Sequence, residues 1–124
     1  MMKGTITNFR ARLPLFIKGA GGQGNVEFTI DTGYTGTLTL PVAICQALQI
    51  EEANTVPSWL ADGNQIELTS YYLVAEWDGK ERDVEILAVG TEPLLGAIML
   101  DGHKLCLDFC NNTFTIEKSS RYTG

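Results

Sequence analysis

The chain has 124 residues, and its length and 44% apolar content suit one ordinary hydrophobic core. Its formal net charge of −6 excludes the basic surface on which nucleic-acid binding depends. No segment has the length and apolar content of a membrane span, and no signal peptide opens the chain, so we expect one cytoplasmic domain over residues 1–124 with no membrane partner.

The first predicted elements are two strands. Apolar residues alternate from Phe9 to Ile17 and from Val26 to Ile30, the period of a strand with one buried face. The glycine-rich segment 19–24 between them predicts a hairpin turn. Its glycines also match the spacing of a dinucleotide-binding fingerprint, but that fingerprint must open a helix, and here a strand pattern follows. We therefore expect no cofactor.

A short strand and a short helix come next. The strand pattern covers Thr37 to Leu40 and ends at Pro41, whose fixed φ suits the first turn of a helix. Apolar residues within segment 44–48 have helical spacing, which predicts a helix that ends near Gln49.

The second half of the chain is predicted to form hairpins. Asp-Gly dipeptides favour tight turns, and they occur within segment 56–69 and within segment 70–89. The first hairpin should have an exposed tip at residues 61–64. A brief apolar segment runs from Pro93 to Leu100, and two last strands are expected on either side of Asn111-Asn112. Many short strands with one or two short helices predict an all-β, barrel-like domain.

The three cysteines are expected to be reduced thiols, because their number is odd and nothing indicates secretion. Cys106, Cys110 and Asp108 would share one face of a strand and, with His103, loosely resemble a zinc cluster. His103 falls on the other face, however, and no further Cys pair or nearby His completes four ligands. We expect no metal.

The residues with the clearest chemical meaning are Asp31, Thr32 and Gly33, at the end of the second predicted strand. Gly33 allows a sharp turn that leaves the carboxylate of Asp31 pointing outward, and the hydroxyl of Thr32 can hold the loop by hydrogen bonds. These residue types suit a positioned general acid or base. A simpler interpretation is that Asp31 only caps a turn.

The sequence around this tripeptide favours the first of these two interpretations. The whole stretch from Val26 to Pro41 resembles the catalytic strand and loop of retropepsin-like aspartic peptidases, especially small bacterial ones. Pro93-Leu94-Leu95-Gly96 resembles the second landmark of that family, an apolar pair followed by Gly. The predicted tip at 61–64 falls where the family carries its flap. The resemblance covers about residues 13–109 and implies a closed, retropepsin-like acid-protease barrel with its active site at a homodimer interface.

This resemblance implies an aspartic endopeptidase that acts on a polypeptide substrate. The tripeptide occurs once, so a second catalytic carboxylate must come from another copy, and Asp31, Thr32 and Gly33 would be the catalytic residues. The candidate substrate contacts are Tyr34, Trp59, Leu60, Ala61, Asp62 and Gly63.

Two of these candidates admit other interpretations. The family often has Ala or Ser where this chain has Tyr34, so the floor of the cleft or its specificity should differ. Trp59 has packing as its simpler role. The alternative function is a non-catalytic dimeric module that binds peptides or a partner protein in the same groove.

Overall fold

Ten strands and one short helix form within residues 1–121, the part of the chain that this computed structural model describes; residues 122–124 of the predicted domain lie outside it. The strands are β1 (Met2–Thr7), β2 (Arg10–Lys18), β3 (Gln23–Ile30), β4 (Leu38–Leu40), β5 (Glu51–Trp59), β6 (Gln65–Trp77), β7 (Lys80–Ala88), β8 (Leu94–Leu95), β9 (His103–Asp108) and β10 (Thr113–Lys118). The helix, α1 (Val42–Ala47), is too short to cross a membrane.

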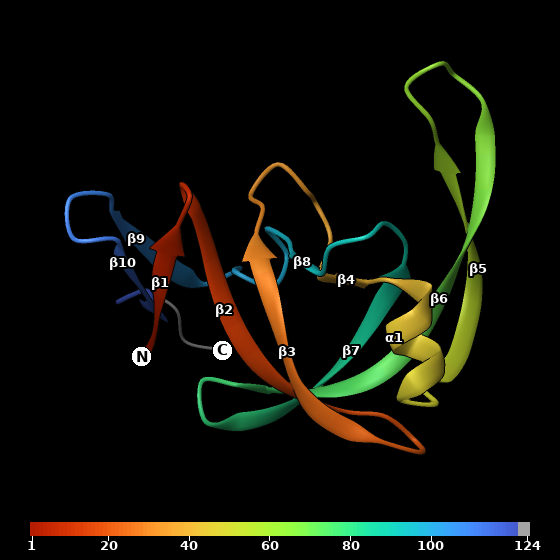
Figure 1. The fold of residues 1–124 in the computed structure, drawn as a ribbon, viewed down its shortest axis with the longest axis horizontal. Helices are drawn as coiled ribbons and strands as arrows, with labels where there is room; N and C mark the ends of the chain where they lie inside the picture. The colour runs from red at the N-terminus through yellow and green to blue at the C-terminus, as the bar shows by residue number, and fades with distance from the viewer. Residues whose placement is uncertain (122–124) are drawn as a thin grey trace.

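The strands form one sheet in the order β5-β6-β7-β4-β8-β3-β2-β1-β10-β9, and an additional pairing of β6 with β2 closes part of it (Figure 1). Six strands, β2, β3, β8, β4, β7 and β6, thereby form a ring. The ring encloses fully buried apolar side chains such as Ile17, Phe28, Leu38 and Leu95. Outside it, β1, β10 and β9 extend the sheet on one side, and β5 lies at the other end.

The chain begins with a strand that the sequence pattern did not reveal. β1 has one buried apolar side chain, Ile6, so it shows little alternation, and it is held by pairing with β2 and β10. Phe9, which we predicted as the first residue of a strand, lies instead in the turn between β1 and β2. Asn8 and Phe9 both have positive φ, 52° and 64°, and the Phe9 side chain is 88% exposed. This conformation suits a tight hairpin turn.

Strand β6 is longer than either predicted hairpin arm. It runs without a break through the expected boundary between Thr69 and Ser70, so one strand serves both hairpins. Its first part pairs with β5, which begins at Glu51 rather than near Val56 and contains an irregularity between Glu52 and Thr55. The β5–β6 hairpin stands away from the ring in Figure 1. Both predicted hairpins are confirmed: the first has longer arms than predicted, and in the second residues 70–77 pair with residues 80–87, within the predicted segment.

The predicted helix is confirmed in place. Pro41 is its N-cap residue, and the chain leaves the helix at Gln49 with a φ of 47°. Cys45 is fully buried and packs the helix against the core. A second short helix is not formed after Gly96; residues 97–102 make a series of turns instead.

Candidate active site

Asp31 follows directly after β3, and its backbone is fixed by the neighbouring strand β8. The N–H of Asp31 donates to the carbonyl oxygen of Leu95 over 2.9 Å, and the N–H of Thr29 donates to that of Pro93 over 2.9 Å. Parallel pairing of Ile30 with Leu95 continues this contact. The residue predicted to be catalytic is therefore attached to the buried core through β8.

The Asp31 carboxylate is oriented by its own loop. The N–H of Gly33 donates to Oδ1 of Asp31 over 3.0 Å, and the N–H of Tyr34 donates to the Asp31 carbonyl oxygen over 3.1 Å. A Cβ atom at Gly33 would lie 3.2 Å from that same Oδ1, tighter than an ordinary van der Waals contact. Gly33 thus leaves room for the carboxylate, while Thr32 and Gly33 are exposed to solvent.

The Tyr34 ring packs inside the loop. A Cβ atom at Gly36 would overlap the Tyr34 ring, and a Cβ atom at Gly96 would lie 2.6 Å from Cδ2 of Tyr34, so both glycines make room for the aromatic ring. Burial raises the pKa of the Tyr34 hydroxyl above its ordinary value. The departure from the family pattern at Tyr34 is accommodated by these glycines.

Three consecutive N–H groups join the second sequence landmark to the Asp31 loop. Gly96 donates to Thr37 over 2.6 Å, Ala97 to Tyr34 over 2.8 Å and Ile98 to Gly36 over 3.0 Å, each through its N–H to a carbonyl oxygen. Sequence reasoning identified Gly96 but missed Ala97 and Ile98. Ala97 and Ile98 contribute through their backbone N–H groups, so their residue types give no indication of these bonds.

A charged cluster beside β3 was also missed. Oε1 of Glu92 accepts a hydrogen bond of 2.5 Å from the Thr29 hydroxyl, and Oε2 accepts one of 2.8 Å from Arg10. Arg12 lies 3.8 Å from the same carboxylate. These hydrogen bonds, first from Thr29 and then from Arg10, lower the pKa of Glu92. The spacing of Arg10 and Arg12, which places them on one face of a strand, was the available signal.

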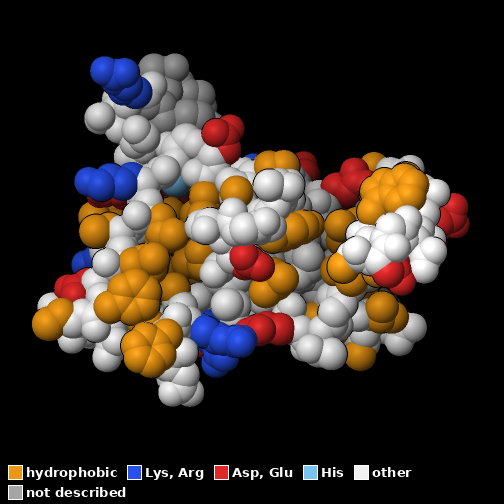
Figure 2. Space-filling view, turned by 90° about the horizontal axis from the view of Figure 1, so that it is seen from above, with side chains coloured by type: hydrophobic (Ala, Val, Ile, Leu, Met, Phe, Trp, Pro, Cys, Tyr) orange, Lys and Arg blue, Asp and Glu red, His pale blue; other side chains and the backbone are white. Residues whose placement is uncertain are grey.

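Five of the predicted substrate contacts, residues 59–63, lie at and beside the tip of the β5–β6 hairpin, which is also the predicted flap. Leu60 donates its N–H to the carbonyl oxygen of Asn64 over 2.8 Å, and both carboxylate oxygens of Asp62 accept bonds from Asn64 over 2.9 Å. Gly63 has a φ of 88°, which favours glycine. The Trp59 side chain is 72% exposed, so it does not pack in the core. Apolar side chains at this projecting hairpin are visible on the right of Figure 2.

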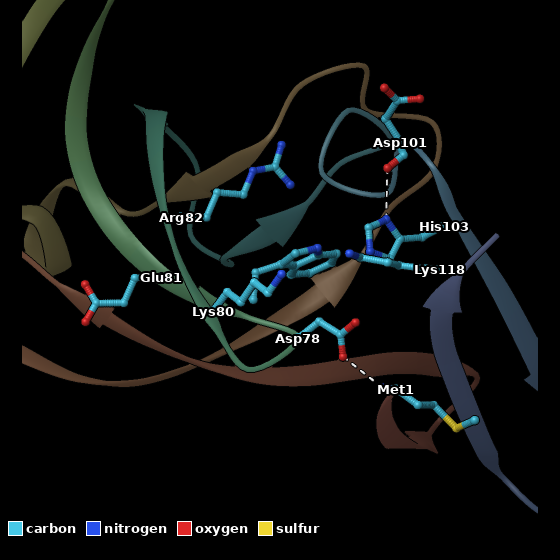
Figure 3. A pocket seen from close by; sticks show the side chains of 9 residues that line it. Met1, Asp78, Lys80, Glu81, Arg82, Asp101, His103 and Lys118 are labelled. Atoms are coloured by element: carbon cyan, nitrogen blue, oxygen red, sulfur yellow. Dashed lines mark hydrogen bonds and ion pairs between the residues drawn. The ribbon is translucent and has the colours of Figure 1, made fainter. Parts of the chain in front are cut away.

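A pocket of about 660 Å³ lies elsewhere, between the β6–β7 turn, the start of β9 and the end of β10 (Figure 3). Side chains of both charge signs line it, including Asp78, Lys80 and Arg82, and Asp31 is not among them. In this pocket the N-terminal ammonium of Met1 lies 2.8 Å from Asp78, and Nδ1 of His103 lies 2.9 Å from the Asp101 carbonyl oxygen. Within residues 1–121 no group of three or more His, Cys, Asp or Glu side chains is placed to hold a metal, and the three cysteines are free.

Comparison with known proteins gives one structural likeness. No known family profile and no curated sequence matches the chain. The EIAV protease, solved in complex with the inhibitor HBY-793, superposes with a TM-score of 0.57 at 18% sequence identity. The match covers 73% of this chain and 85% of the EIAV protease chain. The protein therefore has a mostly β, retropepsin-like fold, as its sequence predicted.

Proposed function

We propose that this protein is an aspartic endopeptidase whose active site forms between two copies of the chain. The observation that carries the proposal is the Asp31-Thr32-Gly33 loop, in which Asp31 is half-buried and the other two residues are exposed, with Oδ1 of Asp31 oriented by Gly33 and the loop held by residues 96–98. It occurs in a retropepsin-like fold. The tripeptide occurs once in the sequence, so the second carboxylate is that of Asp31 in the second copy.

Two carboxylates brought together by two-fold symmetry cannot both ionise, so the pair of Asp31 side chains shares one proton. The ionised carboxylate takes a proton from a water molecule held between the two, and the resulting hydroxide attacks the scissile carbonyl carbon. The protonated carboxylate donates its proton to the carbonyl oxygen. The tetrahedral intermediate then collapses, the C–N bond breaks and the leaving amine receives a proton. No metal or organic cofactor takes part.

The proposed substrate is an extended peptide. The β5–β6 hairpin would close over it, with tip residues 60–63 hydrogen-bonding to its backbone as an added strand would. Trp59 and Leu60, both exposed, would contact apolar substrate side chains, and Tyr34 would shape the floor of the cleft. The net charge of −6 favours neutral or basic peptides over acidic ones.

The direct test is a cleavage profile on a diverse peptide library between pH 4 and 7, read by mass spectrometry at protein concentrations that favour dimers. Wild-type protein is compared with Asp31→Asn, which keeps the shape of the side chain and removes its acid–base chemistry. Cleavage by wild type alone is the expected result. Peptide binding by wild type without any cleavage would overturn the proposal and support a non-catalytic peptide-binding module.

A further inference from the structure

The outer edge of β9 has no neighbouring strand among residues 1–121, because β9 is the last strand in the sheet order. Apolar side chains are exposed on β9 and close to it: Leu107 is 42% exposed and Phe109 is 53% exposed. Figure 2 shows hydrophobic side chains gathered at the side of the molecule where β1, β9 and β10 lie in Figure 1. An open edge with exposed apolar residues is a site for pairing with another strand.

The hydrogen-bond pattern identifies which residues of β9 face outward. The N–H of Ser119 donates to the carbonyl oxygen of Gly102 over 2.9 Å, and this pair continues the antiparallel register of β10 with β9. Backbone groups of alternate residues point to opposite sides of a strand, so those of Lys104, Cys106 and Asp108 point toward β10. The N–H and C=O groups of Leu105 and Leu107 therefore point away from the sheet and are available to a partner strand.

The sequence of β9 is complementary to itself. If two copies of the strand pair antiparallel about Cys106, Lys104 lies opposite Asp108 of the second copy, and Leu105 lies opposite Leu107 of the second copy. The interface thus contains two pairs of opposite charges and two apolar pairs. Cross-strand pairs of both kinds stabilise a sheet. In this register Leu105 and Leu107 form the hydrogen-bonded pairs, and Cys106 faces Cys106 in a non-hydrogen-bonded pair.

This edge is connected to the candidate active site. Residues 97–102 lead directly into β9 and hydrogen-bond to the Asp31 loop through Ala97 and Ile98. The side chain of Ile98 is 51% exposed, although its backbone is bonded to Gly36 of that loop. The open edge of β9 therefore begins a few residues after the segment that holds the Asp31 loop.

We propose that two copies of the chain associate through their β9 edges, with Cys106 opposite Cys106, to form one continuous sheet β1-β10-β9-β9-β10-β1. This inference deepens the proposed function, on which its choice of a second copy as the partner rests. It names the strand and the register through which the second copy would be held.

The register is tested by oxidative cross-linking. Cα atoms of a directly opposed non-hydrogen-bonded pair lie about 4.5 Å apart, within the range that a disulfide spans. Copper phenanthroline should therefore convert Cys110→Ser into a disulfide-linked dimer on a non-reducing gel. Cys106→Ser, which keeps the exposed Cys110, is the matched control, because the two Cys110 residues of a dimer would lie about 25 Å apart.

The expected result is a cross-linked dimer from Cys110→Ser and none from Cys106→Ser. A protein that sediments as a dimer without forming the Cys106 cross-link would overturn the register, and so would cross-linking through Leu107→Cys in a Cys106→Ser background. A protein that stays monomeric at millimolar concentration would overturn the interface itself.

A charge variant tests the same interface without oxidation. Lys104 is opposite Glu117 on β10, so the double variant Lys104→Glu/Glu117→Lys keeps opposite charges within the chain. Across the interface it places Glu opposite Asp108, and the dimer dissociation constant should rise about tenfold. An unchanged constant in an active peptidase would overturn this interface and leave the proposed function standing. A dimer that cross-links at Cys106 but cleaves nothing would support this interface and overturn the proposed function.

Discussion

The N–H of Ala97 donates to the carbonyl oxygen of Tyr34 over 2.8 Å, and this bond joins two segments that are far apart in the sequence. Tyr34 belongs to the loop of the candidate catalytic Asp31, and Ala97 follows Gly96 of the second landmark. Similar bonds from Gly96 and Ile98 lie on either side of it. The position of the Asp31 loop thus depends on how closely the backbone at Gly96 approaches that loop.

Gly96→Ala should weaken both the fold and the activity. The added Cβ atom would lie 2.6 Å from Cδ2 and 2.8 Å from the carbonyl oxygen of Tyr34, and part of this contact is backbone that cannot turn aside. We expect a loss of about 1–3 kcal/mol in the free energy of unfolding, as for other overpacked sites. Urea denaturation measures it. Gly24→Ala is the control, because its Cβ atom meets nothing within 4 Å; equal stability of the two variants would contradict the prediction.

Mixing wild type with Asp31→Asn should inhibit more than simple dilution does. If subunits exchange freely at equal concentrations, only about one dimer in four retains both native carboxylates. Peptide cleavage should then fall to about a quarter of the rate that the same total amount of wild-type protein gives. A rate of about one half would mean that each chain acts alone, against the shared site.

Trp59→Ala should impair substrate binding and leave folding intact. The side chain is 72% exposed, so its removal should change the free energy of unfolding by less than about 0.5 kcal/mol. Loss of the apolar contact with bound peptide should raise KM about tenfold. Tyr72→Ala is the control, since Tyr72 is 50% exposed on the same hairpin but far along it from the tip. A large loss of stability would instead assign Trp59 a packing role.

Glu92→Gln should lower stability at neutral pH and much less in acid. Hydrogen bonds from Thr29 and Arg10 lower the pKa of Glu92 in the folded protein below its ordinary value of 4.5. The stabilisation is therefore fully present above pH 4.5 and is lost as the pH falls through the lower, folded value. Because Glu92 is 35% exposed, we expect at most about 1 kcal/mol.

The measurement is thermal denaturation of both proteins from pH 7 to pH 3. Glu67→Gln, on an exposed position of β6, serves as the control for loss of a surface charge. A difference between wild type and Glu92→Gln that stays constant over this range would contradict the assigned hydrogen bonds.

The parts of the fold that the sequence predicted are those whose backbone conformation is set by the residues at that position. The Asp78-Gly79 turn has positive φ at both residues, 52° and 82°, the conformation for which this dipeptide is suited. Pro41 begins the helix for an equally local reason. The candidate catalytic loop was recognised from the residue types of Asp31, Thr32 and Gly33 themselves.

The parts that were missed depend on partners distant in the sequence. β1 is a strand because β2 and β10 pair with it, and its own residues alternate weakly. The boundary placed between Thr69 and Ser70 was wrong because no turn residue marks it, and pairing with β5 and β7 extends β6 through it. The Glu92 cluster likewise brings together residues from three segments, β2, β3 and the loop before β8, that only the folded sheet places side by side.

The placement of β10 beside β9 has a consequence for how the protein could be switched on. Each copy supplies its own β1, β10 and β9, so a lone copy has a complete core and does not wait for a partner to fold. The protein should therefore unfold cooperatively even at concentrations too low for cleavage, and its melting temperature should rise only over the range in which dimers form and cleavage appears. If the proposed peptidase needs two copies of Asp31, the chain would stay folded and inactive where it is dilute and would become active where its own copies are concentrated.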